Sequence, residues 1–591
     1  MNPTLQQTNR APRTAVRRSR SSAVRVLATA APVAPAQADA IADRSGLKHL
    51  SEAARTRATD KKANKFEKVK VEKCGSTAWT DVFELSQKLK DGNTKWEDLN
   101  LDDIDIRLKW AGLFHRGKRT PLKFMMRLKV PNGELNARQL RFLASSIAPY
   151  GADGCADITT RANIQLRGVT LLEADTIIRG LWDVGLTAFQ SGMDSVRNLT
   201  GNPIAGIDPH ELVDTLPLLR DMEAMLFDNG KGREEFANLP RKLNICISST
   251  RDDFPHTHIN DVGFEAVRHP DSGEVVFNVL AGGYFSIKRN VTSISLPCSV
   301  TEQQLLPFTE ALLRVFRDHG SRGDRQQTRL MWLIEAVGPE KFCALVAEYM
   351  GNGTVLAPAV HVHHDQPWER RNLLGVHPQK QAGLNWVGAC VPAGRLQAAD
   401  FDDIAAVAEQ YGDGTVRITC EENVLFVNVP DAKLPQMLAD PLFKRFTASP
   451  GPLLSGMVSC TALELKRART VCSGNQFCGF GLAETKARAV KVVEMLEAQL
   501  DIPRAVRIHF TGCPNSCGQA QVGDIGLMGA PAKLDGKAVE GYKIFLGGKI
   551  GENPELAKEF AQGIPAVESV LVPKLKEILI KEFGAKEKVI A

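Results

Sequence analysis

The chain of 591 residues contains an internal duplication, and no other feature limits its possible folds as strongly. The string ICISSTRDDFPHTHINDVGF, from Ile245 to Phe264, lies without gaps on IHFTGCPNSCGQAQVGDIGL, from Ile508 to Leu527. The offset between these two strings is 263 residues. Two further pairs occur at offsets of 261 and 265 residues: VPNGEL (from Val130) with VPAGRL (from Val391), and LAGGYF (around Gly282) with FLGGKI (around Gly547). The pairs lie in the same order in both halves. These matches predict two homologous halves that pack as a pseudo-twofold pair.

Within each half the periodicity is mixed. ARQLRFLASSIAPYG, from Ala137 to Gly151, has apolar residues at helical spacing and ends at glycine, whereas ADITTRANIQLRGV, at 156–169, alternates like a strand. FDDIAAVAEQYG and TVRITCEENVLFVNV repeat this order in the second half. We therefore expect an α+β fold with sheets in both halves, and several domains, because a chain of this length is too long for one core.

Four cysteines form two tight pairs in the second half. Cys472 and Cys478 are spaced C-x5-C, and Cys513 and Cys517 are spaced C-x3-C, with glycines beside them that let backbone N–H groups approach a bulky group. Such pairs can hold one iron–sulfur cluster by four thiolates. The alternatives are a four-cysteine zinc site, whose usual spacings are shorter, and disulfides, for which twelve cysteines in the chain are sparse.

The first half differs because it has Thr250 and Phe254 where the second has cysteines, so only one half can hold a cluster. It is instead rich in basic residues near glycine and proline turns: Arg127, Arg161, Arg167, Arg197, Arg241 and Lys242. We expect Arg161 and Arg167 to share one face of a strand, because they are six residues apart. Converging cations suit a polyanionic cofactor or an oxyanion substrate, and ordinary surface arginines are the alternative.

The N-terminal segment has the composition of an organellar transit peptide. The first 38 residues contain no Asp or Glu, carry six arginines, and include no continuous apolar stretch of the kind found in secretory signals. The alternative is a basic arm that binds nucleic acid. Residues 1–46 hold seven Arg against Asp39 and Asp43, a net +5 of the chain's +6, so the remaining body is nearly neutral. No apolar run is long enough to span a membrane, and we expect a soluble protein.

On these motifs the chain resembles the ferredoxin-dependent nitrite reductases of plastids, within the nitrite and sulfite reductase family. The resemblance covers about residues 50 to 580. It implies two cofactors, sirohaem and a [4Fe–4S] cluster. It further implies that Cys472, Cys478, Cys513 and Cys517 bind the cluster, and that Cys517 also bridges to the sirohaem iron. A shared thiolate gives electrons a path without a gap.

The resemblance also assigns the polar residues of the site. Those implied to face the substrate are Arg127, Arg197, Lys242 and Asn244. Those implied to hold the carboxylates or the rim of sirohaem are Arg161, Gln165, Arg167, Arg241 and Asn515.

The implied architecture is internally duplicated and pseudo-twofold, with paired ferredoxin-like half-domains and two sirohaem/iron–sulfur reductase α/β domains. We expect these parts in chain order: a transit peptide and disordered arm (1–46), an N-terminal extension (47–109), the first ferredoxin-like half-domain (110–185), the first reductase domain (186–350), the second half-domain (375–440) and the second reductase domain with the cluster (450–591).

The implied activity is the six-electron reduction of nitrite to ammonium in the plastid stroma, for nitrogen assimilation. Reduced ferredoxin is the implied electron donor, because no complete nucleotide-binding motif is visible in the sequence. We expect a monomer with no membrane or nucleic-acid partner. A ferredoxin-dependent sulfite reductase is the near alternative; Asn244, in a Lys-x-Asn string, favours the singly charged anion. A metal-stapled regulator that binds nucleic acid is the distant alternative.

Overall fold

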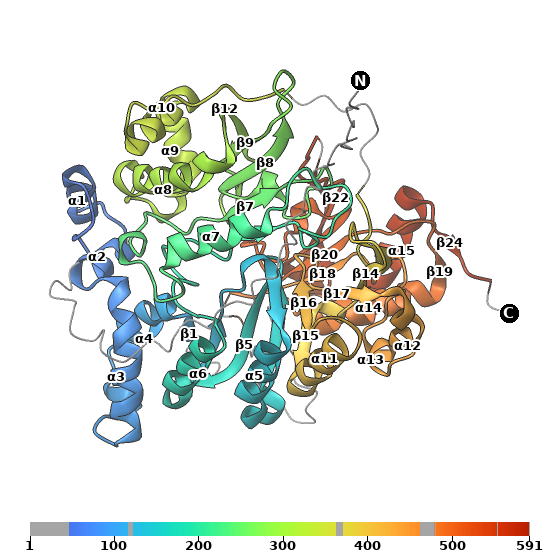
Figure 1. The fold of residues 1–591 in the computed structure, drawn as a ribbon. Coiled ribbons are helices and arrows are strands. Elements are labelled where there is room, and N and C mark those ends of the chain that lie inside the picture. Colours follow the sequence, from blue (N-terminus) through green and yellow to red (C-terminus); the bar gives the residue numbers. More distant parts are fainter. Residues whose placement is uncertain are drawn as a thin grey trace, which may run out of the picture.

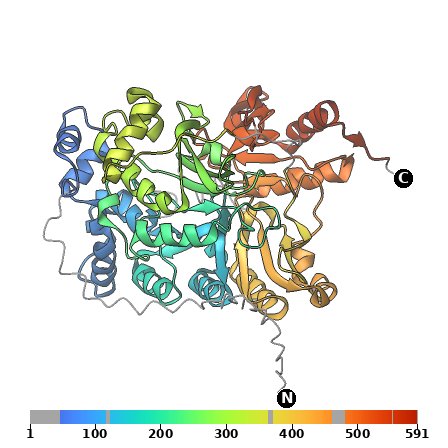
Figure 2. The same ribbon diagram turned by 45° about the horizontal axis from the view of Figure 1, so that its top comes forward.

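Four five-stranded sheets in the described part of the chain form two matched pairs. The computed structural model describes residues 46–115, 122–361, 370–460, 478, 480–551 and 553–589. Figures 1 and 2 show the first half of the sequence on the left and the second half on the right. The expected α+β duplication is thus visible in the arrangement of the sheets.

The first pair of sheets exchanges one short strand across the pseudo-twofold axis. One sheet has the order β1 (Leu113–His115), β2 (Lys123–Arg127), β5 (Asn163–Thr170), β4 (Cys155–Thr159) and β15 (Arg395–Gln397). The other has the order β13 (Gly375–Pro378), β14 (Leu384–Ala389), β17 (Val424–Pro430), β16 (Thr415–Ile418) and β3 (Glu134–Asn136). Because β3 pairs with β16 and β15 pairs with β4, each half completes the other's sheet.

Helices α5 (Ala137–Ile147) and α11 (Ala398–Tyr411) lie side by side below these sheets in Figure 1. Asn136 and Gln139 begin α5 with a capping box, in which each side chain accepts the other residue's backbone N–H at 2.9 Å. Leu140 and Leu143 bury one face of the helix in a hydrophobic core that both sheets share. The helices that complete this layer are α6 (Leu171–Asp183), α12 (Leu434–Leu438) and α13 (Leu442–Arg445).

The second pair of sheets repeats one strand pattern. In the first half the order is β12 (Ile294–Val300), β9 (Val275–Ala281), β8 (Val262–Arg268), β7 (Ile245–Ser248) and β6 (Thr200–Gly201). In the second it is β23 (Lys558–Pro565), β22 (Lys537–Leu546), β21 (Ile525–Leu534), β20 (Ile508–Thr511) and β18 (Met457–Ser459). In both sheets the last three strands are parallel and the others antiparallel.

Helices cover these sheets and extend from the N-terminus. The helices of the first sheet are α7 (Leu216–Phe227), α8 (Glu302–His319), α9 (Leu330–Val337) and α10 (Pro339–Met350), and those of the second are α14 (Lys486–Gln499) and α15 (Glu568–Phe583). The N-terminal helices are α1 (Glu52–Thr59), α2 (Lys65–Glu72), α3 (Ala78–Lys90) and α4 (Leu101–Asp105). Short strand pairs complete the fold: β10 (Tyr284–Phe285) with β11 (Asn290–Val291), and β19 (Leu500–Asp501) with β24 (Lys586–Glu587). None of the described helices combines the length and the apolar character that a membrane crossing requires.

One expectation about a strand is wrong. Residues 156–169 form a hairpin of β4 and β5 and not a single strand, and Thr159 pairs directly with Asn163. Ala162, with φ 45°, reverses the chain. Arg161 therefore lies in the turn, while Arg167 lies on β5, and the two do not share a strand face. The alternating pattern continued through the turn because a tight hairpin interrupts it for only three residues.

A buried carboxylate joins the two halves at the exchanged strand. Asp157 on β4 is 1% exposed and forms ion pairs with Arg167 of its own half at 2.8 Å and with Arg395 of the other half at 2.6 Å. Lys486, from α14, lies 3.7 Å away. Burial alone would raise the pKa of Asp157, but Arg395, Arg167 and Lys486 together hold it far below its usual range.

We expect Asp157→Ala to lower the free energy of unfolding by about 3–5 kcal/mol, because it leaves buried cations without their carboxylate. The measurement is the urea unfolding transition of the purified holoprotein. Glu409→Ala is the matched control: Glu409 and Arg141 also join the two halves, but their side chains are 50% and 45% exposed, so the loss should stay below about 1 kcal/mol. Equal losses in the two variants would contradict the role given to Asp157.

Candidate functional site

The loop that follows β20 carries two of the expected cluster cysteines. Cys513 is buried and Cys517 is exposed. At the end of the loop Gln519 is left-handed, with φ 56°, and the residue 263 positions earlier, His256, has φ 58°. His256 Nδ1 lies 3.0 Å from Gln519 Oε1, so the equivalent loops of the two halves meet and hydrogen-bond to each other.

Cys478 and Cys517 are near enough to Cys513 to affect its protonation. Burial raises the pKa of Cys513 to about 11, and the negative charges of Cys517 and Cys478 act in the same direction. Asn515 Nδ2 donates a weak hydrogen bond to Cys513 Sγ at 3.5 Å. Thiols that oppose one another's ionisation become thiolates when a bound metal compensates their charge. Cys472, the fourth expected ligand, lies outside the described residues.

The sequence analysis missed Cys460, which the structure places at this loop. Cys460 directly follows β18, and its backbone N–H donates to the carbonyl of Phe510 on β20 at 3.2 Å. Its Sγ lies 3.5 Å from Thr511 Oγ1. One signal was available: both Cys460 and Cys472 precede a small hydroxyl residue, Thr461 and Ser473.

Two expected substrate-binding arginines converge on one carbonyl group. Arg127 Nη1 lies 3.4 Å and Arg197 Nη1 lies 3.2 Å from the carbonyl oxygen of Ser191. Burial lowers the pKa of Arg127 to about 10, while the Cys517 thiolate opposes that shift. Burial, followed by the charge of Arg127, holds the pKa of Arg197 well below its ordinary value. Burial and repulsion from neighbouring arginines both destabilise the charged forms of these two arginines, and a bound anion would offset that destabilisation.

The segment before β7 holds the other expected cations beside Arg197. The backbone N–H of Arg197 donates to the carbonyl of Leu243 at 2.8 Å. Asp261 accepts the backbone N–H of Asn244 at 2.8 Å and pairs with Arg329 at 2.6 Å, which fixes the start of the strand. The duplicated Asp524 accepts the N–H of Arg507 in the same way, also at 2.8 Å.

Lys242 and Arg241 are half-buried, and their side chains form no hydrogen bond or ion pair within the part of the chain that the structure describes. Burial, then the positive charges of Arg329, Arg241 and Arg197, lower the pKa of Lys242 well below 10.5, while Cys517 opposes them. Burial lowers the pKa of Arg241 to about 10. Arg127, Arg197, Arg241 and Lys242 are called the cation group below.

The hairpin turn with Arg161 connects the cation group to the cysteine loop. Thr160 Oγ1 donates to the carbonyl of Cys517 at 3.0 Å. Arg161 donates to Asn260 Oδ1 and to the carbonyl of Asn198, both at 2.7 Å, and its buried Nε has no partner among the described residues. The first half thus presents its cations to the exposed cysteine of the second half.

Two other expected cofactor residues are bound to each other. Arg167 Nη2 donates to Gln165 Oε1 at 2.9 Å, and the Arg167 guanidinium also pairs with Asp157. Both side chains come from β5, close to Arg127, whose pKa Arg167 lowers. Asn515 lies beside Cys513, and Gln165 pairs directly with Arg127 across β5 and β2, while the roles assigned to the nine residues stay predictions.

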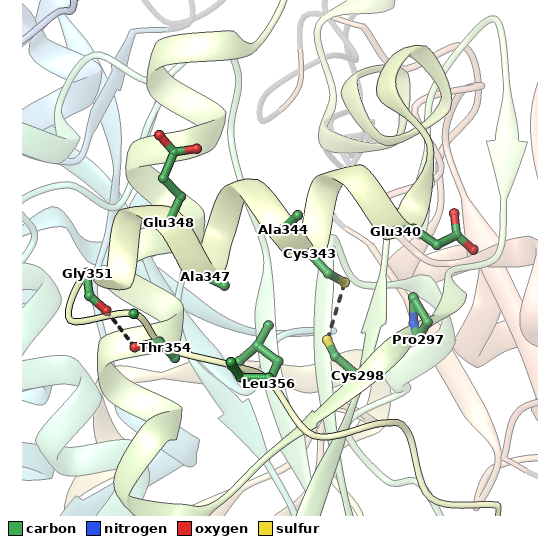
Figure 3. A pocket seen from close by; sticks show the side chains of 12 residues that line it. Pro297, Cys298, Glu340, Cys343, Ala344, Ala347, Glu348, Gly351, Thr354 and Leu356 are labelled. Carbon is green, nitrogen blue, oxygen red and sulfur yellow. Dashed lines mark hydrogen bonds between the residues drawn. The ribbon is translucent and has the colours of Figure 1, made fainter.

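A separate pocket lies elsewhere and contains none of these residues. Figure 3 shows it between α10 and the end of β12, lined mainly by small and apolar side chains together with Glu340 and Glu348. Cys298 Sγ and Cys343 Sγ stand 3.4 Å apart in its wall. The pocket therefore belongs to the first reductase-type sheet and not to the candidate site.

The donor set fits an iron–sulfur cluster with an anionic neighbour. Thiolates are the ligands that such clusters use, and the unpaired cations and the orphaned Arg161 Nε match the carboxylates of an acidic macrocycle. No three His, Cys, Asp or Glu side chains within the described ranges converge on the position of a single ion. A cubane cluster does not require such convergence, because it distributes its four thiolates over four irons.

Comparisons with known proteins agree with this donor set. The family model "Nitrite and sulphite reductase 4Fe-4S domain" matches residues 192–353 and 464–584, and "Nitrite/Sulfite reductase ferredoxin-like half domain" matches residues 116–182 and 377–443. The chain belongs to the nitrite and sulphite reductase family. Each model matches twice, which confirms that the duplication includes both the half-domains and the reductase domains of this family.

Members of the family are similar over most of the chain. The chloroplastic ferredoxin–nitrite reductase of Zea mays is 48% identical over 82% of this chain and 83% of its own length. The ferredoxin–nitrite reductase of Synechococcus elongatus is 46% identical over 90% of this chain and 99% of its own. The solved structure of the Mycobacterium tuberculosis NirA protein superposes with a TM-score of 0.75 at 26% identity, covering 88% of this chain and 93% of that one.

We expect a small anion such as nitrite to bind the cation group less tightly as pH rises through the lowered pKa of Lys242. Lysine is charged below its pKa, so affinity should fall as pH rises, and this fall should occur before the ordinary lysine range near pH 10. The measurement is a spectral titration of the holoprotein with nitrite at increasing pH. Lys242→Arg is the control: arginine stays charged, and the fall should disappear. An unchanged pH dependence in this variant would rule out Lys242 as its source.

Proposed function

We propose that this chain reduces nitrite to ammonium, a six-electron reaction, with reduced ferredoxin as the electron donor. The observation that carries the proposal is the meeting of the cation group of the first half, which forms no ion pair with a carboxylate within the described ranges, with the Cys517 loop of the second. The ferredoxin–nitrite reductases of Zea mays and Synechococcus elongatus, each similar over more than four fifths of the chain, support it. A site that combines electron supply with anion binding is what such a reaction needs.

We propose the following roles for the residues that would hold the cofactors. Cys478, Cys513 and Cys517 would supply thiolates to the cluster, and Cys517 would also serve as a ligand of sirohaem. The residues proposed to hold the sirohaem carboxylates and rim are Arg161, Gln165, Arg167, Arg241 and Asn515. When bound, the two cofactors supply single electrons to the substrate and accept replacements from ferredoxin.

The chain's own contribution is to bind the anion and to deliver protons. Arg127, Arg197 and Lys242 hold the anion by charge-assisted hydrogen bonds and stabilise the negative charge that develops as N–O bonds weaken. Lys242 is the better proton donor of the three, because burial lowers the pKa of its ammonium well below the ordinary lysine value, whereas a guanidinium keeps its protons.

Asn244 supports nitrite over sulfite as the preferred substrate. Asp261 accepts the backbone N–H of Asn244, and the side chain of residue 244 is a neutral amide two residues from Lys242, so it adds no further charge. Three cations and a neutral amide suit a singly charged anion, whereas a doubly charged anion is better matched by one more cation.

The plastid is the proposed location, and the monomer is the proposed state. The acid-free, arginine-containing N-terminal segment and the chloroplastic relatives support the plastid, although a cyanobacterial relative is equally similar. Ferredoxins are acidic carriers, and a local basic patch of this chain would guide their docking, with association rates that fall at high salt.

The decisive experiment is an assay of the purified holoenzyme with reduced methyl viologen and either nitrite or sulfite as the sole electron acceptor. We expect ammonium formation from nitrite to exceed sulfide formation from sulfite. A preference for sulfite would replace the proposal by the alternative reductase. A protein that lacks the Soret-type absorption band of a tetrapyrrole would instead favour the metal-stapled regulator.

We expect Asn244→Lys to raise the ratio of sulfite to nitrite kcat/KM by about tenfold, or about 1.4 kcal/mol of differential transition-state stabilisation, because it adds a cation beside Lys242. The ratio is measured with methyl viologen as the common donor. Asn244→Gln keeps the neutral amide and serves as the control for altered side-chain size. The same ratio in the lysine variant and the wild type would show that residue 244 does not determine the preference.

A further inference from the structure

The described residues contain a cysteine at the cluster loop, Cys460, that is not a member of the expected ligand set. A cluster held by four thiolates needs a partner for Cys478, Cys513 and Cys517. The C-x5-C spacing assigns this role to Cys472, and the matched range of the family model, which begins at residue 464, includes Cys472 and not Cys460. Spacing along the chain, however, does not show which sulfur reaches the loop.

Cys460 leaves the sheet at the same edge as the cysteine loop. Strands β18 and β20 are parallel, with Ser459 paired to Phe510, so both chains emerge together at their carboxyl ends. Cys460 is the first residue after β18, and Cys513 is the second after β20. Side chains at the carboxyl ends of adjacent parallel strands lie close together by construction.

The backbone of Cys460 also touches the loop beside Cys517. A Cβ added to Gly518 would lie 3.3 Å from the Cys460 nitrogen and 2.2 Å from the Phe510 carbonyl oxygen. The backbone at Gly518 therefore approaches the ends of β18 and β20 so closely that only glycine fits there. The Gly518 N–H donates to Thr511 Oγ1 at 3.3 Å, and the same hydroxyl lies 3.5 Å from Cys460 Sγ. One threonine thus connects the Cys460 sulfur to the residue next to Cys517.

The segment after Cys478 is tied to the same two strand ends. Thr485 Oγ1 donates to the carbonyl of Cys460 at 2.5 Å, and the Leu482 N–H donates to the carbonyl of Gly512 at 2.7 Å. Burial raises the pKa of the Cys460 thiol, and the charges of Cys517 and Cys478 act in the same direction. The surroundings of Cys460 are therefore those of a member of the cysteine set.

We propose that Cys460, and not Cys472, is the fourth thiolate ligand of the [4Fe–4S] cluster. The spacing of the first pair then becomes C-x17-C, and the twelve residues Thr461–Cys472 form an insertion between the ligand and the string SGNQF. Removal of these twelve residues would leave Cys460 in a C-x5-C pair with Cys478. The end of a hydrogen-bonded strand holds a ligand side chain in a fixed position, which suits Cys460 to a cluster site. The assignment rests on the cluster of the proposed function but not on the choice of substrate.

The test compares Cys460→Ala with Cys472→Ala in the full chain, purified with its cofactors. We expect Cys460→Ala to lose acid-labile sulfide and the cluster iron to background, and Cys472→Ala to retain both at the wild-type level. The reverse result would overturn the assignment, as would retention of the cluster in both variants. A cluster-replete Cys472→Ala protein that fails to reduce nitrite would count against the proposed function and not against the ligand.

A measurement on the wild-type protein covers the case in which Cys460→Ala does not fold. The native holoprotein is treated with iodoacetamide, and the modified cysteines are identified by mass spectrometry. We expect Cys472 to be alkylated and Cys460 to be protected until the cluster is removed; alkylation of Cys460 with protection of Cys472 would overturn the assignment. A variant that lacks Thr461–Cys472 should also retain its full sulfide content, and loss of sulfide there would show that Cys460 cannot serve.

Discussion

The buried carboxylate of Asp157 is the interaction on which the arrangement of the two halves depends. It receives Arg167 from the neighbouring strand, Arg395 from the strand exchanged by the other half, and Lys486 from the helix of the second reductase domain. Each cation is buried or nearly so, and removal of one partner from a buried group of charges is strongly destabilising. Because β4 continues directly into the Thr160 turn, the same contact fixes where the first half meets the cysteine loop.

The duplication provides two loops of one shape, and their chemistry has diverged. His256 and Gln519 take the same left-handed conformation at the ends of the two loops, yet the residues that correspond to Cys513 and Cys517 are Thr250 and Phe254. One half therefore supplies soft ligands for a cluster, and the other supplies cations for anions. The pseudo-twofold arrangement brings these unlike surfaces together at a single site, which neither half could form by itself.

Periodicity and motif spacing predicted much of this molecule. The helix at 137–151 and its repeat, the duplication and the family all follow from local patterns that the fold preserves, such as the apolar face of α5. The strand proposed at 156–169 failed because alternation does not reveal a short hairpin turn, and Arg161 was misplaced for that reason. Cys460 was missed because its role depends on the pairing of β18 with β20, which lie about fifty residues apart in the chain.

The sequence by itself determined the family, the α+β class and the residue types that the chemistry needs, because cysteine spacing and repeated strings are properties of short segments. Only the tertiary structure decided which of these residues meet: that the Lys242 side chain has no hydrogen-bond or ion-pair partner among the residues the structure describes, that Arg167 is held by Asp157, and that Cys460 stands at the cysteine loop. The physical reason is that burial, charge pairing and proximity are set by contacts between strands far apart in the chain, and no local pattern encodes them.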